Sequence, residues 1–77
     1  MDTTERSRAV ASAARWLIDN DEPATLATIA RWGEAYRGLA LRRLSDTAFA
    51  KFAADVERER AAQVQEAADI AAMGLGR

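Results

Sequence analysis

The sequence predicts an all-α protein: a three-helix bundle or a helical hairpin with a long C-terminal helix, which we expect to be dimeric. About a quarter of the 77 residues are alanine, the strongest helix former. Apolar residues recur at helical spacing in three segments, and residues 45–73 contain neither Gly nor Pro. We therefore expect a single helical domain over residues 1–77, with helices at about 3–20, 24–44 and 46–73.

The first predicted helix, residues 3–20, has a start signal and one apolar face. Asp2 and Glu5 have the spacing of a capping box. Trp16 lies at the edge of the apolar face, where an indole can be half buried with its N–H in water. The face itself is formed by residues at i, i+3, i+4 and i+7 spacing: Val10, Ala13, Ala14, Leu17 and Ile18.

A break follows at residues 19–23, where three acids surround an asparagine and precede the single proline. Pro23 fixes its own φ and disfavours helix in the residue before it. Either Asp21 or Thr25 can cap the helix that follows.

The second predicted helix, residues 24–44, has an apolar arc close to half its circumference, so we expect it to pack against two neighbours. Gly33 and Ala40 lie on the centre of that arc, where small side chains let another helix approach closely. Gly33 and Gly38 each cost about 1 kcal/mol relative to Ala in a helix interior. The helix must therefore be held by packing, or it kinks or breaks near a glycine. The central line contains Leu26, Ile29, Gly33, Tyr36, Ala40 and Leu44, flanked by Trp32, Leu39, Ala30 and Leu41.

The third predicted helix begins after Ser45, a strong N-cap residue, and ends at Gly74 and Gly76. Its apolar stripe is aromatic at first and alanine-rich later: Phe49, Phe52, Ala53, Val56, Arg60, Gln63, Val64, Ala67, Ile70 and Ala71. Arg60 and Gln63 interrupt it. They either form a polar layer that selects a partner, or mark the point where the helix leaves the core with the Arg stem over its edge.

The length of the third helix predicts an unpartnered end. As one helix, residues 45–73 would be about 40 Å long, whereas a compact globule of this chain length is only about 30 Å across. Two shorter helices cannot cover the whole stripe. We therefore predict a protein interface formed by six residues at its distal end: Arg60, Gln63, Val64, Ala67, Ile70 and Ala71.

One stretch resembles a known DNA-binding unit. Leu26-Ala27-Thr28-Ile29-Ala30-Arg31, then Gly33, Leu39 and Arg42-Arg43-Leu44, resembles the helix-turn-helix of small bacterial repressors. The resemblance covers about 20 residues and implies a recognition helix after Gly33. It implies DNA contacts by Arg37, Arg42 and Arg43.

The same arginines have a second interpretation. They can form a solvated basic face that pairs with the acidic third helix, because the aromatic residues of this stretch fall on its buried face.

Composition excludes several function classes. The chain has no Cys and no His, which leaves no thiolate or imidazole to bind a metal or activate a nucleophile. We therefore expect no enzyme, no metal or other cofactor, and no small-molecule ligand. The net charge of -1 gives no strong field for nucleic acid or membrane. The N-terminal residues do not resemble a signal peptide, and no apolar run is long enough to span a bilayer, so we expect a cytoplasmic protein without membrane contact.

These observations predict a small helical protein-protein interaction module that acts as an adaptor, inhibitor or regulator of a partner protein. Its size and composition are typical of phage- or plasmid-derived proteins. A homodimer is the simplest way to cover the excess apolar surface. The alternative is a DNA-binding transcriptional regulator that uses residues 26–44.

Overall fold

The computed structural model describes residues 3–36 and 41–75, with side chains to residue 74. Every regular element in these residues is helical: α1 (Thr3–Asp19), α2 (Leu26–Ala35), a 3-10 turn η1 (Leu41–Arg43) and α3 (Asp46–Leu75). The described residues contain no strand. The all-α prediction and the long C-terminal helix are confirmed.

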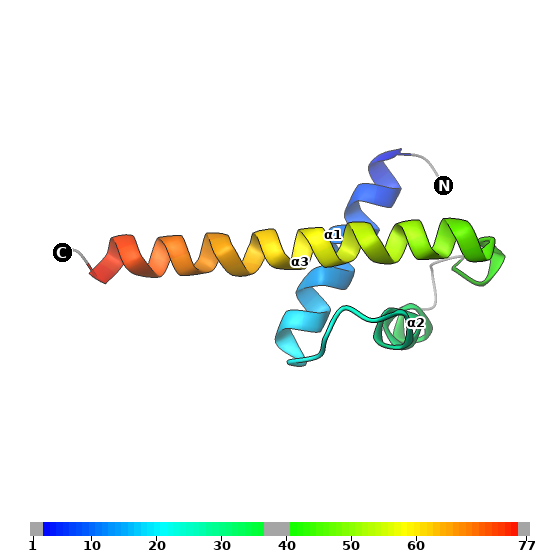
Figure 1. Ribbon diagram of the computed structural model, residues 1–77, viewed down its shortest axis with the longest axis horizontal. Helices are drawn as coiled ribbons and strands as arrows, with labels where there is room; N and C mark the ends of the chain where they lie inside the picture. Colours follow the sequence, from blue (N-terminus) through cyan, green and yellow to red (C-terminus); the bar gives the residue numbers. More distant parts are fainter. Residues whose placement is uncertain (1–2, 37–40, 76–77) are drawn as a thin grey trace.

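α3 is the long axis of the molecule (Figure 1). α1 crosses it steeply and α2 is seen nearly end-on, so the helices meet at a crossing and do not run alongside one another as in a bundle or hairpin. The molecule measures 49 × 24 × 20 Å, and its radius of gyration is 13.8 Å. A compact chain of this length would have a radius near 11.5 Å. The excess comes from the C-terminal half of α3, which projects beyond the other helices (Figure 1).

The end of α1 is a Schellman motif with an aspartate in the position usually taken by glycine. Glu22 N–H donates to the Leu17 carbonyl at 2.9 Å, and Asp21 N–H donates to the Ile18 carbonyl at 3.1 Å. This geometry requires a left-handed residue, and Asp21 has φ 51°. The predicted break is confirmed here, with Pro23 directly after the motif.

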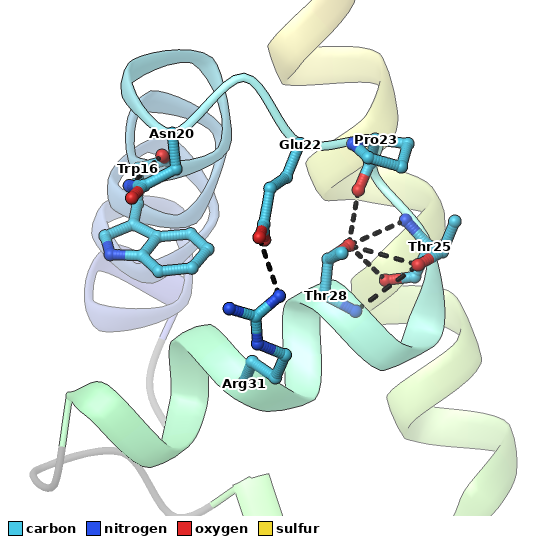
Figure 2. Close-up of polar contacts among 7 residues, drawn as sticks. All are labelled: Trp16, Asn20, Glu22, Pro23, Thr25, Thr28 and Arg31. Carbon is cyan, nitrogen blue, oxygen red and sulfur yellow. Dashed lines mark hydrogen bonds and ion pairs between the residues drawn. The ribbon is translucent and has the colours of Figure 1, made fainter.

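Thr25, and not Asp21, caps α2. Its hydroxyl accepts the Thr28 N–H, while the Thr28 hydroxyl accepts the Thr25 N–H, which completes a capping box (Figure 2). The Thr28 hydroxyl also donates to the Pro23 carbonyl. Glu22 and Arg31 form an ion pair at 2.6 Å that ties the loop to α2 (Figure 2).

The helix predicted over residues 24–44 is shorter than expected, and of the two outcomes left open, a break near a glycine is the one observed. α2 ends at Ala35, and Tyr36, with φ -99° and ψ 80°, has left the helical conformation. A Cβ on Gly33 would overlap the Leu41 side chain, so the absence of a side chain at Gly33 lets Leu41 fold back onto α2. Gly38, Leu39 and Ala40 lie outside the described residues.

The early end of α2 also changes which of its residues are buried. Ile29 and Trp32 are fully buried, whereas Leu26 and Tyr36, predicted at the centre of the apolar face, are 53% and 49% exposed. The broad apolar arc requires one helix that includes residues 36–44. Leu41 instead reaches the core from η1. The buried face is therefore narrower than predicted.

The core lies where α1 and α2 meet the first half of α3. Trp32 is its largest fully buried side chain, and its ring stacks with Phe52 at a centroid distance of 6.1 Å. Small residues on α1 permit close approach of α3, and Trp16 is half buried beside them, as predicted. The buried set is Ala9, Val10, Ala13, Ala14, Leu17, Ile29, Trp32, Leu41, Phe52, Ala53 and Val56.

The predicted cap of α3 is confirmed, because the Ser45 hydroxyl accepts the Ala48 N–H at 3.2 Å. The predicted stop at Gly74 is wrong: α3 continues through it to Leu75. A glycine in an exposed last turn weakens a helix without ending it. Gly76 lies outside the described residues, as does Asp2, the predicted cap of α1.

Candidate protein interface

α3 divides into a packed half and a free half. Phe52, Ala53 and Val56 are buried against the other helices. In residues 61–74, every side chain is exposed except that of Gln63, which is partly buried. The free half is about four turns long and projects past α1 (Figure 1).

The apolar stripe of the packed half continues along the free half. Val64, Ala67, Ile70 and Ala71, which we call the free stripe, follow Phe52 and Val56 at helical spacings and lie on the same side of α3. Val64 is 47% exposed and Ile70 is 62% exposed. The free stripe is thus core-like in composition but has nothing covering it within the described residues.

Met73 is an exposed apolar residue that sequence reasoning missed. It is 75% exposed, more than Val64 or Ile70. Its position on the helical wheel is about 120° from Ala67, so periodicity alone assigned it to the solvent side. Only its size and its place at the tip of α3 could have drawn attention to it.

Arg60 and Gln63 lie at the junction between the two halves, and both are partly buried. Gln63 donates to the Glu59 carboxylate at 3.2 Å and approaches the Ala11 carbonyl of α1 at 3.5 Å. The Arg60 Nε atom is buried and has no hydrogen-bond partner within the described part of the chain. These two residues therefore mark the place where α3 leaves α1.

Asp55 fixes α1 on the packed half of α3. Its mostly buried carboxylate pairs with Arg6 of α1 and with Arg58 one turn along α3. On a helical wheel of α3 alone, Asp55 falls on the solvent side. It is mostly buried because α1 packs across part of that side, where Arg6 meets it.

Charge is unevenly distributed around the free stripe. Residues 61–75 contain two acids, Glu66 and Asp69, and no basic residue. At the base of the stripe stands Arg60, and on α1 the exposed Arg8 and Arg15 lie about one turn to either side of Ala11. The free half of α3 therefore carries two acids near Ala67 and no base, whereas the junction with α1 carries both signs: Glu59 stands beside Arg60, and Arg15 pairs with Asp19 at 3.2 Å.

The candidate DNA-contact residues lie elsewhere. Arg42 and Arg43 are exposed on η1, and Arg42 pairs with Glu34 at 3.4 Å. Arg37 lies outside the described residues. After α2, the described residues 41–44 form a 3-10 turn and not a recognition helix. The second interpretation expected the arginines of this stretch to pair with acids of α3. Arg31 instead pairs with Glu22, and Arg42 pairs with Glu34.

Comparison of the chain with protein-family models, curated proteins and solved structures found no match. In the described ranges, no helix combines the length and apolar character needed to cross a bilayer. The same ranges contain no cluster of three or more acidic side chains that could bind a metal ion.

Proposed function

We propose that this protein is a small, non-enzymatic helical interaction module that docks on a partner protein through the free stripe. Arg60 and Gln63 form the polar base of the docking surface. The module acts in the cytoplasm as an adaptor, inhibitor or regulator, in keeping with a phage or plasmid origin. The observation that carries the proposal is the exposure of a core-like stripe along four turns of α3.

The energetics favour docking of this half-helix. Burial of a Val or Ile side chain contributes about 1.5–3 kcal/mol relative to its exposed state, and Val64 and Ile70 retain about half or more of their exposure in the free chain. Because α3 is already helical, docking does not carry the entropy cost of ordering a disordered segment. An amphipathic helix laid into an apolar groove is a common mode of recognition between proteins.

Site-specific photo-cross-linking in producing cells tests the proposal. A photoreactive amino acid at Ala67, in the free stripe, should give a discrete cross-linked product. The same group at Ala62, which is also exposed but lies on the opposite side of α3, is the matched control and should give little. Equal products from both positions, or none from Ala67, would contradict docking through the free stripe. Mass spectrometry of the product identifies whether the partner is a second copy or another protein.

DNA binding by Arg42 and Arg43 is the alternative proposal, supported by their exposure next to each other on η1. Binding through phosphate contacts would weaken steeply as salt is raised, because counterions are released. The Arg42→Ala, Arg43→Ala double variant would then lose retention on duplex DNA at low salt, whereas Arg8→Ala, Arg15→Ala on α1 would not. Absence of any retention of the wild-type chain at low salt would exclude this alternative.

A further inference from the structure

We infer that the free stripe is self-complementary and that, in the absence of another partner, it is covered by the free stripe of a second copy in an antiparallel pair centred on Ala67. This inference rests on the proposed function, since it names an occupant for the same docking surface. It specifies orientation, register and strength of the pair, each of which can be tested separately.

The spacing of the large residues defines the register. Val64 and Ile70 each lie three residues from Ala67, on opposite sides of it. If a twofold axis passes through Ala67, Val64 of one copy faces the partner's Ile70, and the reverse contact forms in the other half of the pair. The twofold axis repeats this Val64–Ile70 contact, so the large side chains of both copies are covered. Val64 does not face Val64, and Ile70 does not face Ile70.

The residues at and beyond the centre allow the two helices to approach closely. Ala67 lies on the axis, and Ala71 and Gly74 follow along the same side of α3. A Cβ added to Gly74 would meet nothing within 4 Å, so the tip of the stripe is open in the single chain. In the proposed register, residue 74 of one copy faces Arg60 of the other, because each lies seven residues from Ala67.

The helix dipole favours the antiparallel orientation, because neighbouring antiparallel helices bring opposite ends of their dipoles together. In this register, the C-terminal end of each α3 lies beside Arg60 of the other copy, because residues 60 and 74 each lie seven residues from Ala67. The last turn of α3 also carries unpaired carbonyl groups and the negative end of the helix dipole, which favour a nearby cation. Arg60, which is only partly buried, is the cation that this register places there.

The size of the contact predicts a weak dimer. Two helices that overlap over about four turns share roughly 22 Å of length, and two of the four free-stripe side chains are alanine. Such a contact is smaller than the standard interface of about 1,600 Å². The pair should therefore form at high micromolar concentration and dissociate on dilution, which leaves the free stripe available to a stronger partner.

Cysteine cross-linking tests the register, and the chain offers a clean background because it has no cysteine. Ala67→Cys should form a disulfide-linked dimer in a glutathione redox buffer at least about tenfold faster than Ala62→Cys, because only residue 67 meets its own copy across the axis. Val64→Cys mixed with Ile70→Cys should give mainly the mixed dimer, whereas each alone should cross-link slowly. All four positions are exposed, so these substitutions leave the core intact.

The outcomes separate orientation, self-pairing and the proposed function. Rapid self-cross-linking of Val64→Cys and of Ile70→Cys, without preference for the mixed dimer, would show a parallel pair and overturn the antiparallel register. Equal slow rates for Ala67→Cys and Ala62→Cys would overturn self-pairing altogether. Self-pairing could fail in this way while photo-cross-linking at Ala67 still captured a different protein, in which case the proposed function would stand without this inference.

Discussion

Asp21 has a backbone conformation that residues with a side chain rarely adopt. A left-handed conformation costs an L-residue about 1–2 kcal/mol, less for Asp than for most, and Asp21 adopts it with φ 51° to complete the end of α1. Asp21→Gly removes this cost, although glycine also loses more backbone entropy on folding. We expect the free energy of unfolding to rise by up to about 1 kcal/mol, measured by urea denaturation.

Two further substitutions at the same site are its controls. Asp21→Asn keeps the tolerance for a left-handed backbone and removes the charge, so the stability should change little. Asp21→Val places a β-branched side chain at positive φ and should lower the stability. If Asp21→Gly were less stable than the parent chain, the carboxylate would have to contribute more than the backbone conformation costs.

Gly33 is the second residue at which local preference and tertiary packing conflict. It costs helix stability in the interior of α2, but it leaves the space that Leu41 occupies. Gly33→Leu should displace Leu41 from the core and lower the free energy of unfolding by about 1–3 kcal/mol. Thermal unfolding followed by circular dichroism measures the change.

Ala35→Leu is the matched control, because it adds a leucine at an exposed position in the same helix. Its melting temperature should stay close to that of the parent. Equal melting temperatures for both variants and the parent would mean that Leu41 does not pack on Gly33 in solution.

At the scale of the element, α3 should behave as two halves with different effects on stability. Val56 is fully buried and Val64 is 47% exposed, although both are valines on the same side of the helix. Val56→Ala should cost about 2–3 kcal/mol, from lost burial and a residual cavity. Val64→Ala should be nearly neutral, since alanine is also the better helix former.

Denaturant unfolding at low micromolar concentration, where the chain is monomeric, compares the two variants. A loss of stability from Val64→Ala as large as that from Val56→Ala would show that the distal half folds against the body of the same chain. That result would remove the basis for treating the free stripe as a docking surface.

The elements also show where sequence reasoning succeeds and fails. The starts of α2 and α3 and the end of α1 depend on side chains within a few residues, such as Ser45 at the N-cap, and these signals are readable in the sequence. The end of α2 depends on Leu41 packing on Gly33, a contact that no local pattern contains. The free half of α3 was predictable because it follows from length alone, whereas the partial burial of Asp55 follows from the way α1 crosses α3, which the sequence does not specify.

At the scale of the whole molecule, shape distinguishes the proposed dimer from a compact one. A single chain has a radius of gyration of 13.8 Å. The packed body is centred near Val56, eleven residues from Ala67, so the two bodies of an antiparallel pair lie about 16 Å from the axis on either side. Combining this separation with the radius of each chain gives about 20 Å for the dimer, whereas a compact chain of twice this length would measure about 15 Å.

Small-angle X-ray scattering over a dilution series measures this difference, and we expect the radius to rise toward about 20 Å as the mass doubles. Ile70→Glu places a carboxylate on the contact with the partner's Val64 and should hold both mass and radius at the monomer values. Ala62→Glu adds the same charge on the opposite side of α3 and should dimerise like the parent. A doubled mass with a radius near 15 Å would mean that the chains pack body to body. In that case the apolar residues exposed at the two ends of α2, Leu26 and Tyr36, would replace the free stripe as the surface to test.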